Sequence, residues 1–296
     1  MNDNEILRRT SRTFYLTIRF LPRSVRGEVA LAYLLARATD TIADSSAADT
    51  LARLDVLIAA RSSLSAPSID GYRAKEWIGY QRDPAEQQLL SALPRFWSRM
   101  HAQQDGLVAG VIGSILEGQI FDLQRFAADS APLSDDELVR YTYLVAGSVG
   151  EFWTDLCAAR LGDFAADPPD EMRRRARHYG QALQLVNILR DRRMDAALGR
   201  SYVTATDTAR WTEQGRAWLA DGAVYCAALR SGRLRYATLL PALLGARTLS
   251  LVAAQPADAL TPAKVSRSEL RIWMFRTLPV WWSAQRVRTL FADASE

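Results

Sequence analysis

Apolar residues recur every three or four positions through most of the 296-residue sequence, and Pro or Gly usually marks the breaks. This spacing is typical of amphipathic helices. No stretch shows the alternation of apolar and polar residues that predicts a half-buried strand, and there is neither a repeat nor a low-complexity segment. We therefore expect an all-α protein. Because no linker divides the sequence, we also expect a single domain over residues 1–296.

Caps and prolines predict where several helices begin and end. Pro22 is expected to start a helix that ends near Asp44, and Ser134 with Glu137 forms a capping box for a helix through Leu161. We expect Pro94 to kink or break its helix. The other boundaries are a helix entry at 10–14, helices at 51–64, 84–103, 107–127, 212–230 and 236–254, a cap at 167–169, an irregular flap at 199–211, and loops at 65–73 and 255–262.

Composition indicates which kinds of binding partner and which cellular location to expect for the protein. The net charge is +4 and the pI about 9.2, which suits anionic substrates and anionic membrane surfaces. The Arg residues are spread along the chain without a binding motif, so nucleic acid is not expected. Cys157 and Cys226 lie in apolar helical context and are interpreted as reduced core residues. With no signal peptide, and no apolar run near the roughly 18 residues of a membrane span, we expect a cytoplasmic protein.

Two pairs of carboxylates stand out on otherwise apolar helices. Asp191 and Asp195 are four residues apart, and therefore about 40° apart around a helix axis. Gln184 and Asn187 continue the same polar row. Like charges at this spacing repel, and a cation held between them would remove that cost.

A second pair repeats the arrangement near the start of the chain. Asp40 and Asp44 have the same spacing, with Arg37 one turn before Asp40 and Tyr33 one turn before Arg37. Mg²⁺ is typically held by one or two carboxylates together with phosphate oxygens and water, and Arg binds phosphate with two hydrogen bonds. The spacing is compatible with a metal–diphosphate site, and equally with ordinary acidic pairs facing water.

Five segments strengthen the first interpretation, because in order and spacing the sequence resembles the squalene/phytoene synthase family, the head-to-head prenyl diphosphate synthases. The segments are Ser11–Phe14, Tyr33–Asp44, Tyr141–Glu151, Gln181–Asp195 and, more weakly, Gly199–Tyr202. The most specific parts are Tyr-x-x-x-Val-Ala-Gly-x-Val-Gly and Gln-x-x-Asn-Ile-x-Arg-Asp.

The resemblance implies an all-α isoprenoid synthase fold with helices around a central pocket. It also implies Mg²⁺ between the two aspartate motifs, ionisation of a prenyl diphosphate, and attack of a second prenyl chain on the allylic cation. The implied metal ligands are Asp40, Asp44, Asn187, Asp191 and Asp195. The implied diphosphate contacts are Ser11, Arg12, Thr13, Tyr33, Arg37, Gln184 and Arg190. The residues implied to line the prenyl pocket are Phe14, Tyr141 and Val145, with Tyr141 also counted as catalytic.

We expect a farnesyl-diphosphate farnesyltransferase of the squalene-synthase type, because Arg235–Ala254 and Lys264–Arg267 look more like that branch. NADPH would then supply hydride if squalene is the product. The alternatives are a phytoene synthase that uses geranylgeranyl diphosphate and a non-catalytic member acting in assembly or lipid binding. Met194, at a position where the family usually has Glu, and the Arg192–Arg193 pair keep the last alternative open.

Three other features receive structural or surface interpretations. Glu117 and Asp122 are interpreted as solvated acids on a helix face, with a site role as the alternative, and His101 and His178 as structural. Basic and aromatic residues alternate from Lys264 to Phe291, and Pro279 is expected to divide this stretch into two helical pieces. One hypothesis places the stretch on the surface of a membrane, peripherally on its cytoplasmic face; the other packs its Trp residues in the core.

Overall fold

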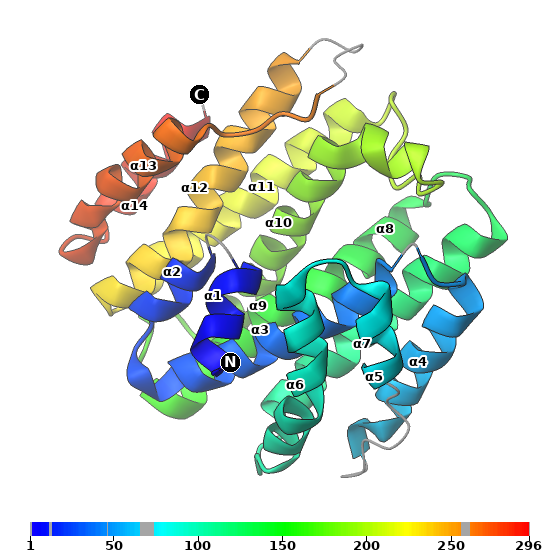
Figure 1. The fold of residues 1–296 in the computed structure, drawn as a ribbon. Coiled ribbons are helices and arrows are strands. Elements are labelled where there is room, and N and C mark those ends of the chain that lie inside the picture. The colour runs from blue at the N-terminus through cyan, green and yellow to red at the C-terminus, as the bar shows by residue number, and fades with distance from the viewer. Residues whose placement is uncertain (1, 12–13, 46, 66–73, 256–260, 296) are drawn as a thin grey trace. The chain divides into compact units, whose positions relative to one another are not determined.

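The computed structural model describes residues 2–11, 14–45, 47–65, 74–255 and 261–295, and its elements are helical (Figure 1). Ala165 and Leu229 form one isolated β-bridge. The all-α prediction is confirmed. The described chain groups into two compact units, which we call the N-terminal unit (1–19 and 23–129) and the C-terminal unit (20–22 and 130–296). The single domain stays a prediction.

The N-terminal unit is built around α3, which contacts α4, α6 and α7. Its helices are α1 (Asp3–Ser11), α2 (Phe14–Phe20), α3 (Arg23–Ala43), α4 (Thr50–Ser62), η1 (Ser63–Ser65), α5 (Ala74–Trp77), η2 (Ile78–Tyr80), α6 (Pro84–His101) and α7 (Leu107–Ala128). The start after Pro22 is confirmed. Pro94 does not break α6, which continues through it. The expected loop at 65–73 lies almost wholly outside the described residues.

The C-terminal unit is built around α10, which contacts α9, α11 and α12 (Figure 1). Its elements are α8 (Asp135–Thr142), the π-helical turn η3 (Tyr143–Gly147), α9 (Ser148–Leu161), α10 (Pro169–Ala197), α11 (Thr208–Ala228), α12 (Gly232–Ala254), α13 (Arg267–Arg276), η4 (Leu278–Trp281) and α14 (Arg286–Ser295). The capping box at Ser134 and Glu137 is confirmed. The C-terminal stretch is divided as expected, but into three pieces, and Pro279 lies within the short helix η4 rather than at a break. The helix predicted through Leu161 contains the unforeseen turn η3.

Small residues let the backbone of α10 touch those of α9 and η3. A Cβ atom on Gly150 would lie 1.9 Å from the carbonyl oxygen of Ala176, and one on Gly180 would lie 2.1 Å from that of Ala146. Both distances are far below any van der Waals contact, so only glycine fits. Gly in mid-helix costs up to about 1 kcal/mol relative to Ala, and the close approach of the two helices is what offsets that cost.

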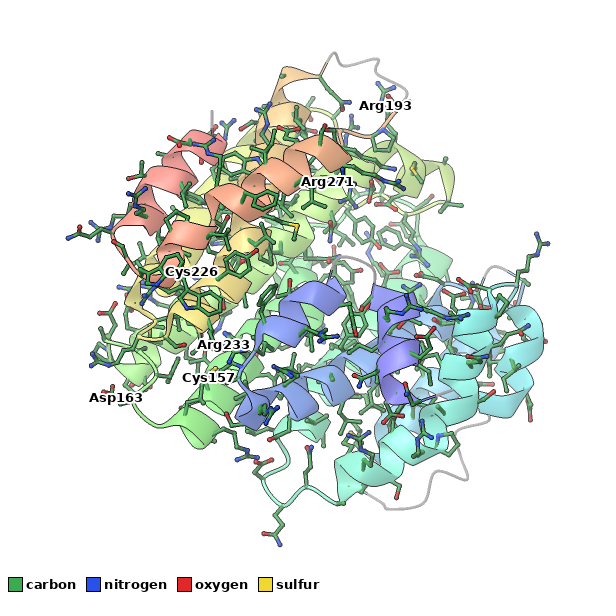
Figure 2. The ribbon with its side chains drawn as sticks, turned by 60° about the vertical axis from the view of Figure 1, so that its left-hand side comes forward. Cys157, Asp163, Arg193, Cys226, Arg233 and Arg271 are labelled. Atoms are coloured by element: carbon green, nitrogen blue, oxygen red, sulfur yellow. The ribbon has the colours of Figure 1, made fainter. Side chains whose placement is uncertain are left out.

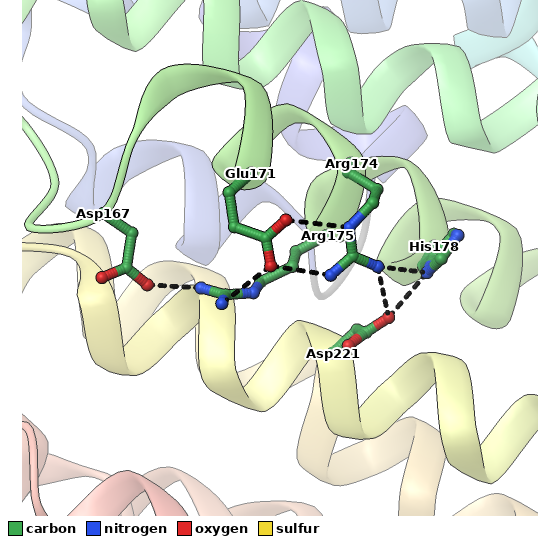
Figure 3. A network of polar contacts seen from close by, with 6 residues as sticks. All are labelled: Asp167, Glu171, Arg174, Arg175, His178 and Asp221. Carbon is green, nitrogen blue, oxygen red and sulfur yellow. Dashed lines mark hydrogen bonds and ion pairs between the residues drawn. The ribbon is translucent and has the colours of Figure 1, made fainter.

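A network of ion pairs joins the beginning of α10 to α11 (Figure 3). His178 Nδ1 lies 2.6 Å from the carboxylate of Asp221, and the His178 ring stacks on Trp218. Arg174 and Arg175 both pair with Glu171. These contacts tie α10 to α11, and the structural role of His178 stays a prediction. Asp167 does not cap α10, because Pro168 occupies the N-cap position and the Asp167 carboxylate pairs with Arg175 instead.

Buried thiols and apolar helices complete the core. Cys157 and Cys226, labelled in Figure 2, are free and buried, and burial raises the pKa of both thiols. The sequence analysis predicted no apolar segment long enough to span a membrane, and two helices contradict this prediction. By length and composition α7 and α12 qualify, although 50% and 44% of their apolar windows are buried inside the protein.

The glycine contact gives a direct stability prediction. Gly150→Ala should lower the free energy of unfolding by about 3 kcal/mol, because its Cβ must push two helix backbones apart. Gly27→Ala is the matched control, since nothing lies within 4 Å of a Cβ there; it should raise stability by about 0.5–1 kcal/mol. Urea denaturation measures both, and equal stability of the two variants would contradict the packing argument.

Candidate active site

Asp40 lies in a largely buried setting in the N-terminal unit. It sits on α3, and Asp44 directly follows the helix, with its backbone N–H donating to the Asp40 carbonyl at 2.8 Å. The two residues therefore keep the helical i, i+4 relation that the sequence predicts. Gln119 on α7 donates from Nε2 to Asp40 Oδ1 at 2.5 Å.

Burial is the main reason that the Asp40 carboxyl holds its proton more tightly than usual. Its pKa rises from 3.8 to about 6, first because of desolvation and second because of the nearby Asp44 charge; Arg37 and the hydrogen bond from Gln119 act in the opposite direction. Groups with raised pKa values of this kind gather at functional sites. A cation bound beside the two carboxylates would offset both the desolvation of Asp40 and its repulsion by Asp44.

Arg37 is held beside this pair with part of its guanidinium unused. Its Nη2 donates to Glu86 Oε1 at 2.8 Å, whereas its Nε is buried and has no hydrogen-bond partner among the described residues. Such a donor is suited to an anionic oxygen. The Tyr33 hydroxyl donates to the Thr10 carbonyl at 3.1 Å, so it ties α3 to α1; its implied diphosphate contact stays a prediction.

The second carboxylate row lies on α10 in the C-terminal unit. Arg190 donates from Nε to Asp191 Oδ1 at 2.9 Å and from Nη2 to Asp191 Oδ2. This double hydrogen bond raises the pKa of Arg190. Asp195 follows one turn later, where its carbonyl accepts from Arg200 N at 2.8 Å. Gln184 is half-buried and Asn187 is exposed.

Aromatic rings and the π-helical turn mark a second part of the same unit. The rings of Tyr141 and Tyr202 stack with centroids 5.2 Å apart, and Tyr141 is buried. Val145 is half-buried in η3. The turn is fastened by buried Glu151, which accepts from the Tyr143 hydroxyl at 3.2 Å and from Arg177 Nε at 2.6 Å. Turns of this type are frequent at functional sites.

The first motif is only partly described. Ser11 is the last residue of α1, and its hydroxyl donates to the Leu7 carbonyl at 2.5 Å. The prediction of a helix entry there is therefore wrong for Thr10 and Ser11, which close one helix; the next begins at Phe14. Arg12 and Thr13 lie outside the described residues, as does the side chain of Phe14.

The donor atoms of the N-terminal unit fit Mg²⁺. Asp40 and Asp44 offer carboxylate oxygens, which this ion prefers, and their mutual repulsion contributes to the raised pKa of Asp40. In the C-terminal unit Asp191 shares both oxygens with Arg190, so its fit requires exchange of that partner. Neither unit by itself brings three His, Cys, Asp or Glu side chains together as a ligand cluster within the described residues.

Three contacts of predicted site residues were not foreseen, namely Gln119 with Asp40, Glu86 with Arg37, and Tyr202 with Tyr141. The sequence gives no local signal for them, since each partner comes from a distant segment. Asp122 corrects a prediction: it is only 5% exposed and is not a solvated acid. Glu117 pairs with Arg61 at 2.6 Å.

The C-terminal stretch exposes apolar and basic residues together. Phe275 and Trp282 are 72% and 79% exposed, and Ile272 and Leu278 are also exposed. Arg271, on α13 (Figure 2), is exposed beside Ile272. Trp273 is buried, with the Arg276 guanidinium 4.7 Å from its ring centroid. Core packing is therefore confirmed for Trp273 and wrong for Trp282.

Sequence comparison places the chain in a family. Residues 7–212 match the squalene/phytoene synthase family, and the chain belongs to it. It is 31% identical over 199 residues to a phytoene synthase of Mycobacterium tuberculosis, covering 67% of this chain and 55% of that protein. A squalene synthase of Candida albicans is 27% identical over 215 residues, covering 71% and 46%. The matches span about half the length of these two relatives.

Structural comparison supports the fold. A dehydrosqualene synthase in complex with a ligand aligns over 98% of this chain and 95% of its own, with a TM-score of 0.61 and 20% identity. A squalene synthase from Alicyclobacillus acidocaldarius aligns over 85% and 92%, with a TM-score of 0.55 and 22% identity. The isoprenoid synthase fold implied by the resemblance is confirmed.

The raised pKa of Asp40 predicts that its ionised carboxylate lowers the free energy of unfolding, to an extent that depends on pH. A carboxyl that binds its proton more tightly in the folded state destabilises the fold once ionised, so the cost appears as pH rises from about 4 through about 6. Without divalent cations, Asp40→Asn should therefore raise the free energy of unfolding by about 1–3 kcal/mol at pH 7.5. The gain should shrink strongly at pH 4.5. Urea denaturation at both pH values tests this, and a gain that is the same at both would contradict it.

Proposed function

We propose that the chain is a Mg²⁺-dependent prenyltransferase that joins two farnesyl diphosphates head to head, giving presqualene diphosphate and, with NADPH, squalene. The observation that carries the proposal is the pair of half-buried Asp40 and exposed Asp44, with the unpartnered Arg37 Nε beside it, in a chain of this family. The pair supplies oxygens for a cation, and the guanidinium supplies a donor for a phosphate oxygen.

In the proposed reaction the C–O bond of one substrate breaks, diphosphate leaves, and a double bond of the second substrate attacks the allylic cation, after which a proton is lost. Mg²⁺, when bound, supplies Lewis-acid stabilisation of the leaving diphosphate. In the N-terminal unit Asp40 and Asp44 would hold Mg²⁺, and in the C-terminal unit Asn187, Asp191 and Asp195 would do so. Arg37 and Arg190 would neutralise charge on the phosphate oxygens.

The hydrocarbon part of the substrate requires dry, unreactive walls. The stacked Tyr141 and Tyr202 and the half-buried Val145 are suited to this, because aromatic faces stabilise cations without donating to them covalently. No described group of residues is assigned to NADPH. Released diphosphate is the proposed proton acceptor.

A phytoene synthase is the second candidate, because relatives at 31% identity include phytoene synthases. The two functions differ in the length of the prenyl chain. Purified protein incubated with Mg²⁺ and either farnesyl or geranylgeranyl diphosphate, with and without NADPH, distinguishes them by the mass of the product. A C30 product supports the proposal; a C40 product alone would replace it with the second candidate.

Asp40→Asn and Asp191→Asn should each lower turnover by at least about 100-fold, because each removes a carboxylate proposed to hold the cation. Asp163→Asn is the matched control, since this exposed carboxylate pairs with Arg230, at 2.9 Å, outside both aspartate motifs, and should leave turnover unchanged. Initial rates at saturating Mg²⁺ measure the effect. Wild type without turnover on either substrate would instead favour a non-catalytic member of the family.

The proposed cellular setting is peripheral, on the cytoplasmic face of an anionic membrane. Exposed Ile272, Phe275, Leu278 and Trp282 would enter the interface, and neighbouring basic residues such as Arg271 would meet anionic headgroups. Aromatic and aliphatic residues on one side with Arg alongside are typical of interfacial contacts.

Liposome flotation tests the membrane contact. The protein should float with vesicles rich in phosphatidylglycerol and less with pure phosphatidylcholine. The double variant Phe275→Ser, Trp282→Ser should lose most of this binding. Leu198→Ser is the control, because Leu198 is 75% exposed but lies outside the C-terminal stretch. Equal flotation of wild type and the double variant would argue against the proposed surface.

A further inference from the structure

Two buried polar atoms beside Asp40 have no hydrogen-bond partner among the described residues, and they differ in character. One is the donor Arg37 Nε, already placed in the proposed phosphate site, and the other is the acceptor Gln119 Oε1. Buried polar side-chain atoms are normally paired. An unpaired acceptor next to a buried carboxylate therefore requires an explanation.

Gln119 is well placed on α7 to act at this carboxylate. Its side chain is only 7% exposed, and its Nε2 donates to Asp40 Oδ1 at 2.5 Å. The same planar amide carries Oε1, so the group that binds the Asp40 carboxylate also carries the unpaired acceptor. The amide fixes the orientation of the carboxylate with one end and keeps the other end available.

We propose that Gln119 is part of the cation site and acts in two ways. Its Nε2 orients Asp40, and its Oε1 accepts a hydrogen bond from a water bound to the Mg²⁺ that Asp40 holds. Mg²⁺ usually keeps several waters when one or two carboxylates bind it, and these waters are donors. The inference rests on the proposed function, because the ion is the same one.

This arrangement gives each polar atom of the Gln119 amide a hydrogen-bond partner. Carboxylate ligands are commonly held by hydrogen bonds from residues that do not touch the metal, and removing such a partner typically weakens metal binding by about 10–100-fold. A Gln suits this role because it provides a donor for the carboxylate and an acceptor for the water on one rigid group. Gln119 is therefore a positioning residue.

Mn²⁺ binding in the presence of inorganic pyrophosphate tests the role without measuring turnover. The electron paramagnetic resonance signal of free Mn²⁺ gives the dissociation constant. Gln119→Met, close in length but without hydrogen bonds, should raise this constant by about 10–100-fold. Gln124→Met is the control, because Gln124 lies on the same helix with an exposed side chain and should bind as wild type does. Pyrophosphate binding without cation should be unchanged in both variants.

Gln119→Asn is the second variant, in case the first fails to fold. It keeps the amide but withdraws it by one methylene, and the same increase in the dissociation constant is expected. Unchanged Mn²⁺ binding in a folded Gln119 variant would overturn the inference alone. Wild type that binds no Mn²⁺ with pyrophosphate would overturn it together with the proposed metal site.

Discussion

Contact between the backbones of α9 and α10 is the constraint on which the C-terminal unit depends. Gly150 removes the side chain that would separate the two helices, Gly180 does the same between α10 and η3, and α10 also contacts α11 and α12. The helix that carries Asp191 is thus central to its unit, so its carboxylate row is supported by packing on several sides. The backbone of the proposed ligand row is therefore held in place, although Asp191 must still exchange its Arg190 partner to bind a cation.

The two carboxylate rows are in different electrostatic states. Asp40 is half-buried, lies near another carboxylate, and has a raised pKa. Asp191 instead shares both oxygens with its neighbour Arg190. The first row therefore carries a cost that a cation would relieve, whereas the charge of Asp191 in the second is already balanced by Arg190. The same spacing in sequence thus produces two different electrostatic environments.

Most of the helical architecture could be predicted from the sequence, because periodicity, caps and prolines act locally. The capping box at Ser134 and the helix start after Pro22 are of this kind. Local rules failed where tertiary packing decides: α6 continues through Pro94, and the chain forms a π-helical turn at Tyr143–Gly147. Asp167 was expected to cap α10, but its carboxylate pairs with Arg175 two turns into the helix instead of with the first backbone N–H groups.

The site was predictable to the extent that its residues lie on one helix. The sequence alone shows that Arg37, Asp40 and Asp44 lie on one side of a helix. It shows the same for Asp191 and Asp195. Gln119 and Glu86 could not be found in this way, because their contacts with α3 arise only when α7 and α6 pack against it. The charge state of Asp40 was equally hidden, since it depends on burial.

The pairing of Arg190 with Asp191 has a consequence for how two ligands would enter. While the pair is intact, both Asp191 oxygens and the Nε and Nη2 of Arg190 are engaged with one another. A cation that takes the Asp191 oxygens releases the guanidinium, and an anion that takes the guanidinium releases the carboxylate. If both act as proposed, each ligand prepares the place of the other, and metal and diphosphate bind with positive cooperativity.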